Sequence, residues 1–174
     1  MNDPKTYYDE ANVVRSEIFE IDAPASVVWS ILIDLDRYGE WNPFCVHARS
    51  TLKMGDPVYM TLNDYTAPGR LASNVEYVCA FEPERRLSWE AYWTEAWPYA
   101  ARRDQTIEPL GPDRCRYQST DAFLGETGVH VMRFCGGWVK RAFDDSGRAL
   151  KARAEAFARG DLSGALKQWT PEAA

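Results

Sequence analysis

The carboxylate best placed for chemistry lies in the segment CRYQSTDAF, residues 115–123. If this segment is a strand, alternation places Asp121 on the same face as Tyr117 and Phe123. These ring-bearing neighbours indicate that the face turns toward the interior. A carboxyl group in apolar surroundings has a raised pKa and can act as a general base or acid. Asp121 and Tyr117 are therefore candidate catalytic residues. The alternative is that Asp121 pairs with an arginine for structure, or caps the turn before Gly125.

A cation is expected on the preceding strand, in the segment AARRDQTIEP. Alternation puts Arg103 and Gln105 on the face of Ile107, and that apolar residue favours an inward direction for all three. An inward Arg103 pairs with Asp121 or stabilises a developing oxyanion. The alternative is an exposed, solvated charge cluster at the start of the strand.

Histidine chemistry rests on one candidate, His130, in the first turn of the long predicted helix. Its imidazole titrates near neutral pH and can shuttle a proton. The alternative is a residue that only starts or packs the helix. The other histidine, His47, is far away in the sequence, and the chain has no H-x-x-x-H pair and no Cys/His cluster. The sequence therefore predicts a site without a metal.

Aromatic side chains make up 13% of the chain, including seven tryptophans, and several gather in the segment YWTEAWPYAARRD, residues 92–104. Loops between strands are normally polar, so these rings predict the border of a binding site, with a semi-rigid lip around Pro98. Aromatic rings stack on aromatic ligands, whereas core packing is the alternative for several of them. The candidate substrate-binding residues are Trp41, Phe44, Trp89, Trp93, Trp97, Tyr99, Phe123, Phe134 and Trp138.

The elements that position these residues follow from periodicity and turn signals. A strand over 13–21 precedes a helix that begins near Asp22 and a second, short helical piece over 35–44. A long helix over 126–160 ends the pattern, and its glycine pair at 136–137 indicates a bend or a close approach of the backbone. Six strands lie between these helices, over 46–53, 56–63, 70–80, 86–94, 101–109 and 113–124.

Short connections between successive strands predict antiparallel neighbours. The predicted fold class is α+β, with a seven-stranded curved antiparallel sheet wrapped around the long C-terminal helix and two short helices after the first strand. Large side chains do not fill such a grip completely, so a ligand cavity is expected between sheet and helix. One domain over 13–160 accounts for the pattern, with an N-terminal extension at 1–12 and a C-terminal tail at 161–174.

The composition argues against several classes of partner. A net charge of −6 argues against a nucleic-acid binder, which would need clustered Lys/Arg, but it does not exclude a local basic pocket. No apolar run approaches the roughly 18 residues of a membrane span, and the N-terminus lacks the form of a signal peptide. The four scattered cysteines predict reduced, mostly buried thiols. We therefore expect a cytoplasmic protein that binds neither nucleic acid nor membrane, and a homodimer is left open.

Four segments together resemble the START/polyketide cyclase-dehydrase superfamily (SRPBCC), whose members share a helix-grip fold. They are IDAPASVVWSILIDLDRYGEWNPF, PERRLSWE, DRCRYQSTDAFLG and GRALKARAE, and the likeness covers most of residues 13–156. The resemblance implies a cavity for a hydrophobic or aromatic small molecule, with the long helix as its floor. It also implies a site that works without a metal or an organic cofactor.

Two functions agree with this resemblance, because one fold hosts many different sites. The first is a cofactor-independent enzyme of the cyclase/dehydratase or lyase type, which acts by acid-base chemistry on a bulky aromatic, phenolic or polyketide-like molecule. Its catalytic residues are then Asp121, Arg103, Tyr117 and His130. The alternative is a binding or carrier protein that holds a hydrophobic molecule in the same cavity without chemistry.

Overall fold

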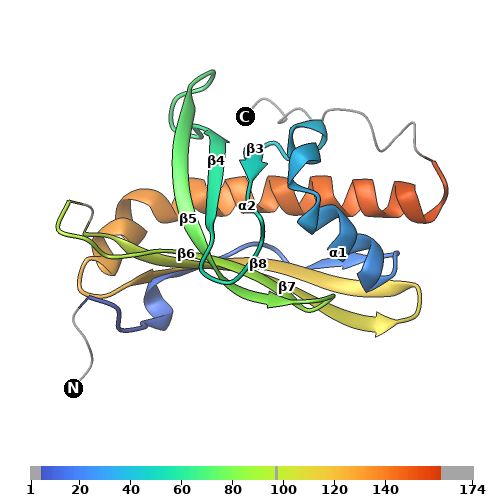
Figure 1. Cartoon of the computed structure of the whole chain (residues 1–174), viewed down its shortest axis with the longest axis horizontal. Coiled ribbons are helices and arrows are strands. Elements are labelled where there is room, and N and C mark those ends of the chain that lie inside the picture. The colour runs from blue at the N-terminus through green and yellow to red at the C-terminus, as the bar shows by residue number, and fades with distance from the viewer. Residues whose placement is uncertain (1–4, 97, 162–174) are drawn as a thin grey trace.

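In the computed structural model a long helix lies across one face of a curved antiparallel sheet (Figure 1). The structure describes residues 5–96 and 98–161. The predicted α+β helix-grip fold is confirmed, with strands in the order β1-β8-β7-β6-β5-β4-β3 and β2 also paired with β8. The elements are η1 (Glu10–Asn12), β1 (Val13–Arg15), β2 (Phe19–Ile21), α1 (Ala25–Ile33), η2 (Leu35–Glu40), β3 (Cys45–Arg49), β4 (Pro57–Asn63), β5 (Leu71–Glu82), β6 (Arg86–Ala91), β7 (Ala100–Gly111), β8 (Arg114–Leu124) and α2 (Gly128–Ala158).

The first predicted strand, 13–21, is two strands, so the described sheet has eight strands instead of seven. β1 and β2 both pair with β8, but their registers differ by one residue across the connection. The Ser16 hydroxyl accepts a hydrogen bond from the Ser119 amide (3.1 Å), and the Glu17 amide donates to Asp144 Oδ1 on α2 (2.7 Å). These side chains satisfy backbone donors that the interrupted ladder leaves without a partner.

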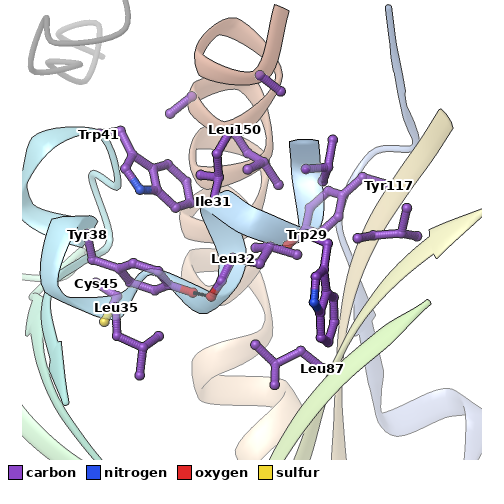
Figure 2. Close-up of a cluster of buried hydrophobic side chains, with 14 of the residues drawn as sticks. Trp29, Ile31, Leu32, Leu35, Tyr38, Trp41, Cys45, Leu87, Tyr117 and Leu150 are labelled. Carbon is purple, nitrogen blue, oxygen red and sulfur yellow. Dashed lines mark hydrogen bonds between the residues drawn. The ribbon is translucent and has the colours of Figure 1, made fainter. Parts of the chain in front are cut away.

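The main core lies between α1, η2, the sheet and the second half of α2 (Figure 2). α1 turns Trp29, Ile31 and Leu32 into this core, and all three are buried. The Tyr38 hydroxyl donates a hydrogen bond to the Leu32 carbonyl oxygen (2.8 Å), and the Tyr38 ring meets the Trp41 ring edge to face at 5.2 Å. η2 is too short to be stable alone, so this packing holds it in place.

Asn42 fixes the connection between η2 and β3 to the long helix. Its Oδ1 accepts hydrogen bonds from the amides of Phe44 (3.0 Å) and Cys45 (2.9 Å) and from the Ser146 hydroxyl on α2 (3.1 Å). A buried side-chain amide that satisfies three donors holds the backbone around it in one conformation. Phe44 is thereby placed at the edge of the space between sheet and helix.

Two glycines of α2 stand where the helix lies close to the sheet. A Cβ on Gly128 would lie 2.2 Å from the carbonyl oxygen of Phe123 at the end of β8, and a Cβ on Gly147 would lie 2.1 Å from a ring carbon of Phe19 on β2. Glycine alone leaves room for such contacts. The glycine pair at 136–137 lies within an unbroken helix. The close contacts between helix and sheet are therefore on either side of the pair.

The predicted extension at 1–12 packs against the domain where the structure describes it. The Gly125 amide donates to the Tyr7 carbonyl oxygen (2.9 Å), and η1 contacts β8 and α2. Residues 1–4, and positions 162–174 of the predicted tail (161–174), lie outside the described residues. The division into extension, domain and tail stays a prediction. No helix in the described part is both long enough and apolar enough to span a membrane.

Replacing Gly147 by alanine is expected to destabilise the protein by about 1–3 kcal/mol, because the new methyl group overpacks against the buried ring of Phe19. The matched control is Gly137→Ala in the same helix. A Cβ there meets open space, so the higher helix propensity of alanine should stabilise the protein by about 1 kcal/mol. Equilibrium urea unfolding of both variants checks the pair, and equal stabilities would contradict the close approach at Gly147.

Candidate functional site

A cavity of about 200 Å³ lies between α2 and the inner face of the strands from β4 to β8. Most of its lining is apolar, and three of the lining residues are charged or acidic: Glu76, Arg103 and Asp121. An apolar enclosure with a few convergent polar groups is the usual form of a small-molecule site. Its aromatic wall consists of Phe44, Trp89, Tyr99, Phe123, Trp138 and Phe143.

Strand register brings Arg103 and Asp121 side by side. The two residues are direct cross-strand partners on β7 and β8, and Trp89 on β6 is the partner of Arg103 on its other side. Glu76 lies two strands away from Arg103, on β5. Side chains alternate between the faces of a sheet, and the residues of all four strands that reach the inner face meet in the cavity.

Arg103 is a buried cation, with only 6% of its surface exposed. Its Nε donates to Ser119 Oγ (3.2 Å), and its guanidinium carbon lies 4.3 Å from the centroid of the Phe143 ring and 5.7 Å from that of Trp89. Aromatic faces stabilise a cation that has lost its water. In the part of the chain that the structure describes, no carboxylate forms an ion pair with this guanidinium.

The two carboxyl groups in the cavity hold their protons more tightly than exposed ones do. Burial raises the pKa of Asp121 to about 7, although the positive charge of Arg103 acts in the opposite direction. Burial, together with the charge of Asp121, raises the pKa of Glu76 to about 8. Arg103 and a hydrogen bond from the Asn74 side-chain amide to Glu76 Oε1 (2.7 Å) partly offset this rise in pKa.

The arrangement combines an acid, a base and a cation in one apolar cavity. Near neutral pH, Glu76 and Asp121 together hold at least one proton, and their titrations are linked because the charge of Asp121 raises the pKa of Glu76. A carboxyl group with such a pKa can donate or accept a proton near pH 7. Within residues 5–96 and 98–161, no three His, Cys, Asp or Glu side chains come together as a set that would hold a metal ion.

Seven of the residues singled out by the sequence line this cavity. They include Asp121 and Arg103, which point inward as their strand alternation predicts. The other five belong to the aromatic wall. Their roles in binding and catalysis stay predictions. These five residues are Phe44, Trp89, Tyr99, Phe123 and Trp138.

Tyr117 lies in the main core beneath the cavity instead of in its lining. Its hydroxyl donates to Gln105 Oε1 (3.3 Å), and burial raises its pKa. Tyr117 shares the inner face of β8 with Asp121, but it is four residues further from the cavity end of that strand. The correct face therefore did not guarantee access to the cavity.

Two residues of α2 that were predicted to belong to the site, His130 and Phe134, do not line the cavity. Both point away from it. Each is exposed, and 76% of the Phe134 surface is accessible. The lining residues of this helix include Val131, Cys135 and Trp138. Successive residues lie about 100° apart around a helix, so His130 and Phe134 fall on the neighbouring, solvent-facing side.

The remaining three tryptophans singled out by the sequence lie elsewhere. Trp41 is buried in the main core and borders a different hollow, between α1, η2 and the end of α2. Trp93 is half-buried, and Lys5 Nζ lies 3.8 Å from the centroid of its ring. Trp97 lies outside the described residues. Aromatic content alone did not separate core and surface rings from cavity rings.

Glu76 and Asn74 are site residues that were not predicted from the sequence. At this end of β5 the apolar residues Val75 and Tyr77 take the outer face, and 42% of the Val75 surface is exposed. From polarity alone, Asn74 and Glu76 would be expected to face solvent, whereas they line the cavity. The useful signal is the alternation of the strand. Asn74 and Glu76 lie on the same face as Val78, which is buried at the centre of the strand, and this face points inward.

Several solved structures share this fold. The aromatase/cyclase Zhui from a Streptomyces species has a TM-score of 0.65 and 17% identity, over 83% of this chain and 93% of that one. A protein from Nitrosomonas europaea has a TM-score of 0.59 and 18% identity, over 82% and 96%. A START superfamily protein from Mycobacterium smegmatis has a TM-score of 0.53 and 19% identity, over 79% and 96%. At these identities the likeness shows the fold alone.

No protein with a curated description matches the chain. A family model described as "Polyketide cyclase / dehydrase and lipid transport" matches residues 11–155, which is most of the sequence. This match agrees with the helix-grip architecture and confirms the resemblance read from the four sequence segments. The chain therefore belongs to the polyketide cyclase/dehydrase and lipid transport family.

Proposed function

We propose that the protein is a cofactor-independent enzyme of the cyclase/dehydratase or lyase type, which acts on a hydrophobic aromatic or phenolic small molecule in the cavity. One observation carries the proposal: Asp121 and Glu76 have raised pKa values and face the buried cation Arg103 inside an aromatic enclosure. Perturbed acids that share a cleft with a cation are typical of catalytic sites.

The proposed chemistry assigns a task to each charged group. Asp121, when ionised, takes a proton from the substrate, and Glu76, when protonated, returns one to the developing product. Arg103 stabilises negative charge as it grows on a substrate oxygen, since a preorganised cation in a dry site is most effective there. The aromatic wall orients the substrate ring, so that its reacting atoms stay near the carboxyl groups.

The cavity volume limits the part of a substrate that is enclosed. A volume of about 200 Å³ equals roughly six water molecules at the volume each takes in the liquid. One aromatic ring with a short chain fits within it. A larger, polyketide-like molecule must extend out past Tyr99, which lines the cavity and is 38% exposed. The reacting end is then the end beside Arg103.

A binding or carrier protein is the other function that the family description allows. A carrier needs the aromatic enclosure but gains nothing from two carboxyl groups in the same cavity, whose burial is unfavourable. The carboxyl pair therefore favours the enzyme. We place the reaction in the cytoplasm, because all four cysteines are free and two of them, Cys45 and Cys115, are buried as thiols.

Asp121→Asn should lower turnover by about 100-fold or more, the usual size of a general acid-base contribution. Ligand affinity should stay within several-fold, because the amide keeps the shape of the side chain. A panel of phenolic and polyketide-like compounds, followed by tryptophan fluorescence for binding and by mass spectrometry for products, provides the measurement. Asp113→Asn, in the exposed β7–β8 turn, is the control.

Equal turnover by the wild type and Asp121→Asn would remove Asp121 from the mechanism. Tight binding with complete recovery of unchanged ligand across the panel would contradict catalysis and support the carrier function instead.

Folding stability should fall as pH rises from about 6 to about 9, because the raised pKa of Glu76 favours its protonated form in the folded state. The stabilising effect is complete below the unfolded pKa and is lost as pH passes the folded pKa. Glu76→Gln cannot ionise, so its melting temperature should fall less over this range, by several degrees, since 1 kcal/mol shifts it by roughly 2–4 °C.

The control for this measurement is Glu126→Gln, because Glu126 is exposed next to the start of α2. Its thermal unfolding curve should follow that of the wild type at every pH. A Glu76→Gln variant whose melting temperature falls as steeply as that of the wild type would show that Glu76 does not hold its proton in the folded state.

A further inference from the structure

The guanidinium of Arg103 is buried without a protein counterion. Two arginines are buried in the described part of the chain, Arg103 and Arg153. Arg153 follows the usual rule for buried charges, because its Nη2 lies 2.6 Å from Glu40 Oε2. Arg103 forms no ion pair within the same described residues, although Asp121 is its cross-strand partner. A buried charge without a partner is strongly unfavourable unless something else compensates it.

The contacts of Arg103 leave one edge of the guanidinium for a ligand. Nε donates to Ser119 Oγ (3.2 Å), and one face stacks on Phe143. Tyr117 approaches the group closely enough for the guanidinium to lower the pKa of its hydroxyl, against the larger effect of burial. The remaining donors are those of the two Nη groups, and the residue lines the cavity. Two parallel N–H donors match the two oxygens of a carboxylate.

The carboxyl groups near Arg103 do not neutralise its charge as a carboxylate ligand would. Asp121 and Glu76 are near enough for the charge of Arg103 to act on their pKa values, yet both keep raised pKa values because burial dominates. At slightly acidic pH the three groups therefore carry a net positive charge. The titratable groups that face Arg103 or line the cavity with it are Glu76 on β5, Asp121 and Tyr117 on β8, Tyr99 before β7, Tyr38 on η2, Cys45 on β3 and Cys135 on α2.

We propose that the cavity binds a small aromatic carboxylate, whose carboxylate group is held by the Nη edge of Arg103 and whose ring lies against the aromatic wall. The proposal rests on the proposed function, because it names the substrate class of the same cavity. A single ring with a chain of two or three carbons suits the enclosed volume of about 200 Å³. The carboxylate of the ligand then serves as the counterion of Arg103, as Glu40 does for Arg153.

This assignment makes binding depend on pH in a defined direction. As pH rises through about 7 and 8, Asp121 and then Glu76 lose their protons. The cavity changes from net positive to net negative, and like charges then repel the ligand. The affinity for a carboxylate must therefore fall with increasing pH, whereas the affinity for an uncharged molecule of the same shape stays nearly constant.

Three probes of matched shape test the proposal: 3-phenylpropanoate, 3-phenylpropan-1-ol and 3-phenylpropylamine. Isothermal titration calorimetry at about pH 6 and about pH 9 gives each affinity, and tryptophan fluorescence reports occupation of the cavity. At the lower pH the carboxylate should bind about tenfold or more tightly than the alcohol, and the amine most weakly. At the higher pH the carboxylate should have lost about tenfold in affinity or more.

Arg103→Met keeps most of the side-chain volume and should abolish the preference for the carboxylate while the alcohol still binds. Binding of the alcohol also shows that this variant is folded. The matched control is Arg102→Met, because Arg102 is the next residue of β7, lies on the outer face and pairs with Asp104 (3.1 Å). This control should keep the preference of the wild type.

The proposal is overturned if the alcohol or the amine binds the wild type at least as tightly as the carboxylate at about pH 6. It is also overturned if Arg103→Met and Arg102→Met have the same selectivity. In both cases, binding of the alcohol leaves the proposed enzyme intact. If none of the three probes alters tryptophan fluorescence or gives heat, the cavity is not a site for small aromatic ligands, and both proposals fail.

Discussion

One curved sheet has to cover a 31-residue helix, and the two surfaces meet closely in only some places. Gly128 lets the start of α2 reach the end of β8, and Gly147 lets its middle reach β2. The residues of α2 that line the cavity, from Val131 to Phe143, lie between these two contacts. Because the helix is held on both sides of this segment and large side chains stand between helix and sheet, a cavity remains where close packing is interrupted.

The position of the cavity determines its electrostatics. Arg103, Asp121 and Glu76 reach the same apolar space from three different strands. Away from water their charges act strongly on one another. Burial drives both acids toward their protonated forms, the charge of Asp121 drives Glu76 further, and Arg103 opposes both shifts. Acid-base capacity near neutral pH and attraction for an anionic ligand are thus two consequences of one cluster.

The inward or outward direction of a strand residue could be predicted from the sequence where an apolar residue of the same strand identified the inner face. Ile107 and Phe123 marked the inner faces of their strands, and that phase correctly predicted the inward direction of Arg103 and Asp121. The glycine pair at 136–137 predicted special backbone, but the two close contacts between helix and sheet are at Gly128 and Gly147, since only the partner surface decides which glycine is needed. The order and type of the elements were predictable because turns and periodicity are local properties.

The features that could not be predicted from the sequence depend on contacts between residues far apart in the chain. The break between β1 and β2 depends on Asp144, more than 120 residues away in the sequence, which accepts the Glu17 amide. The inward direction of Glu76 contradicts the polarity of β5, because the cavity offers it Asn74 as a hydrogen-bond partner and Arg103 as a charge. Phe134 looked like a cavity residue from its type, yet it lies on the solvent-facing side of α2.

The proton-holding carboxyl pair is tested most directly by a ¹³C NMR titration of the side-chain carboxyl carbons of Asp121 and Glu76, assigned with the Asp121→Asn and Glu76→Gln variants. Both titration midpoints are expected above about pH 6, well above the usual values near 4 for exposed carboxyl groups. Because the charge of Asp121 raises the pKa of Glu76, the Glu76 midpoint should also move to lower pH in the Asp121→Asn variant. Two independent midpoints near pH 4 would contradict the acid-base site proposed for this cavity.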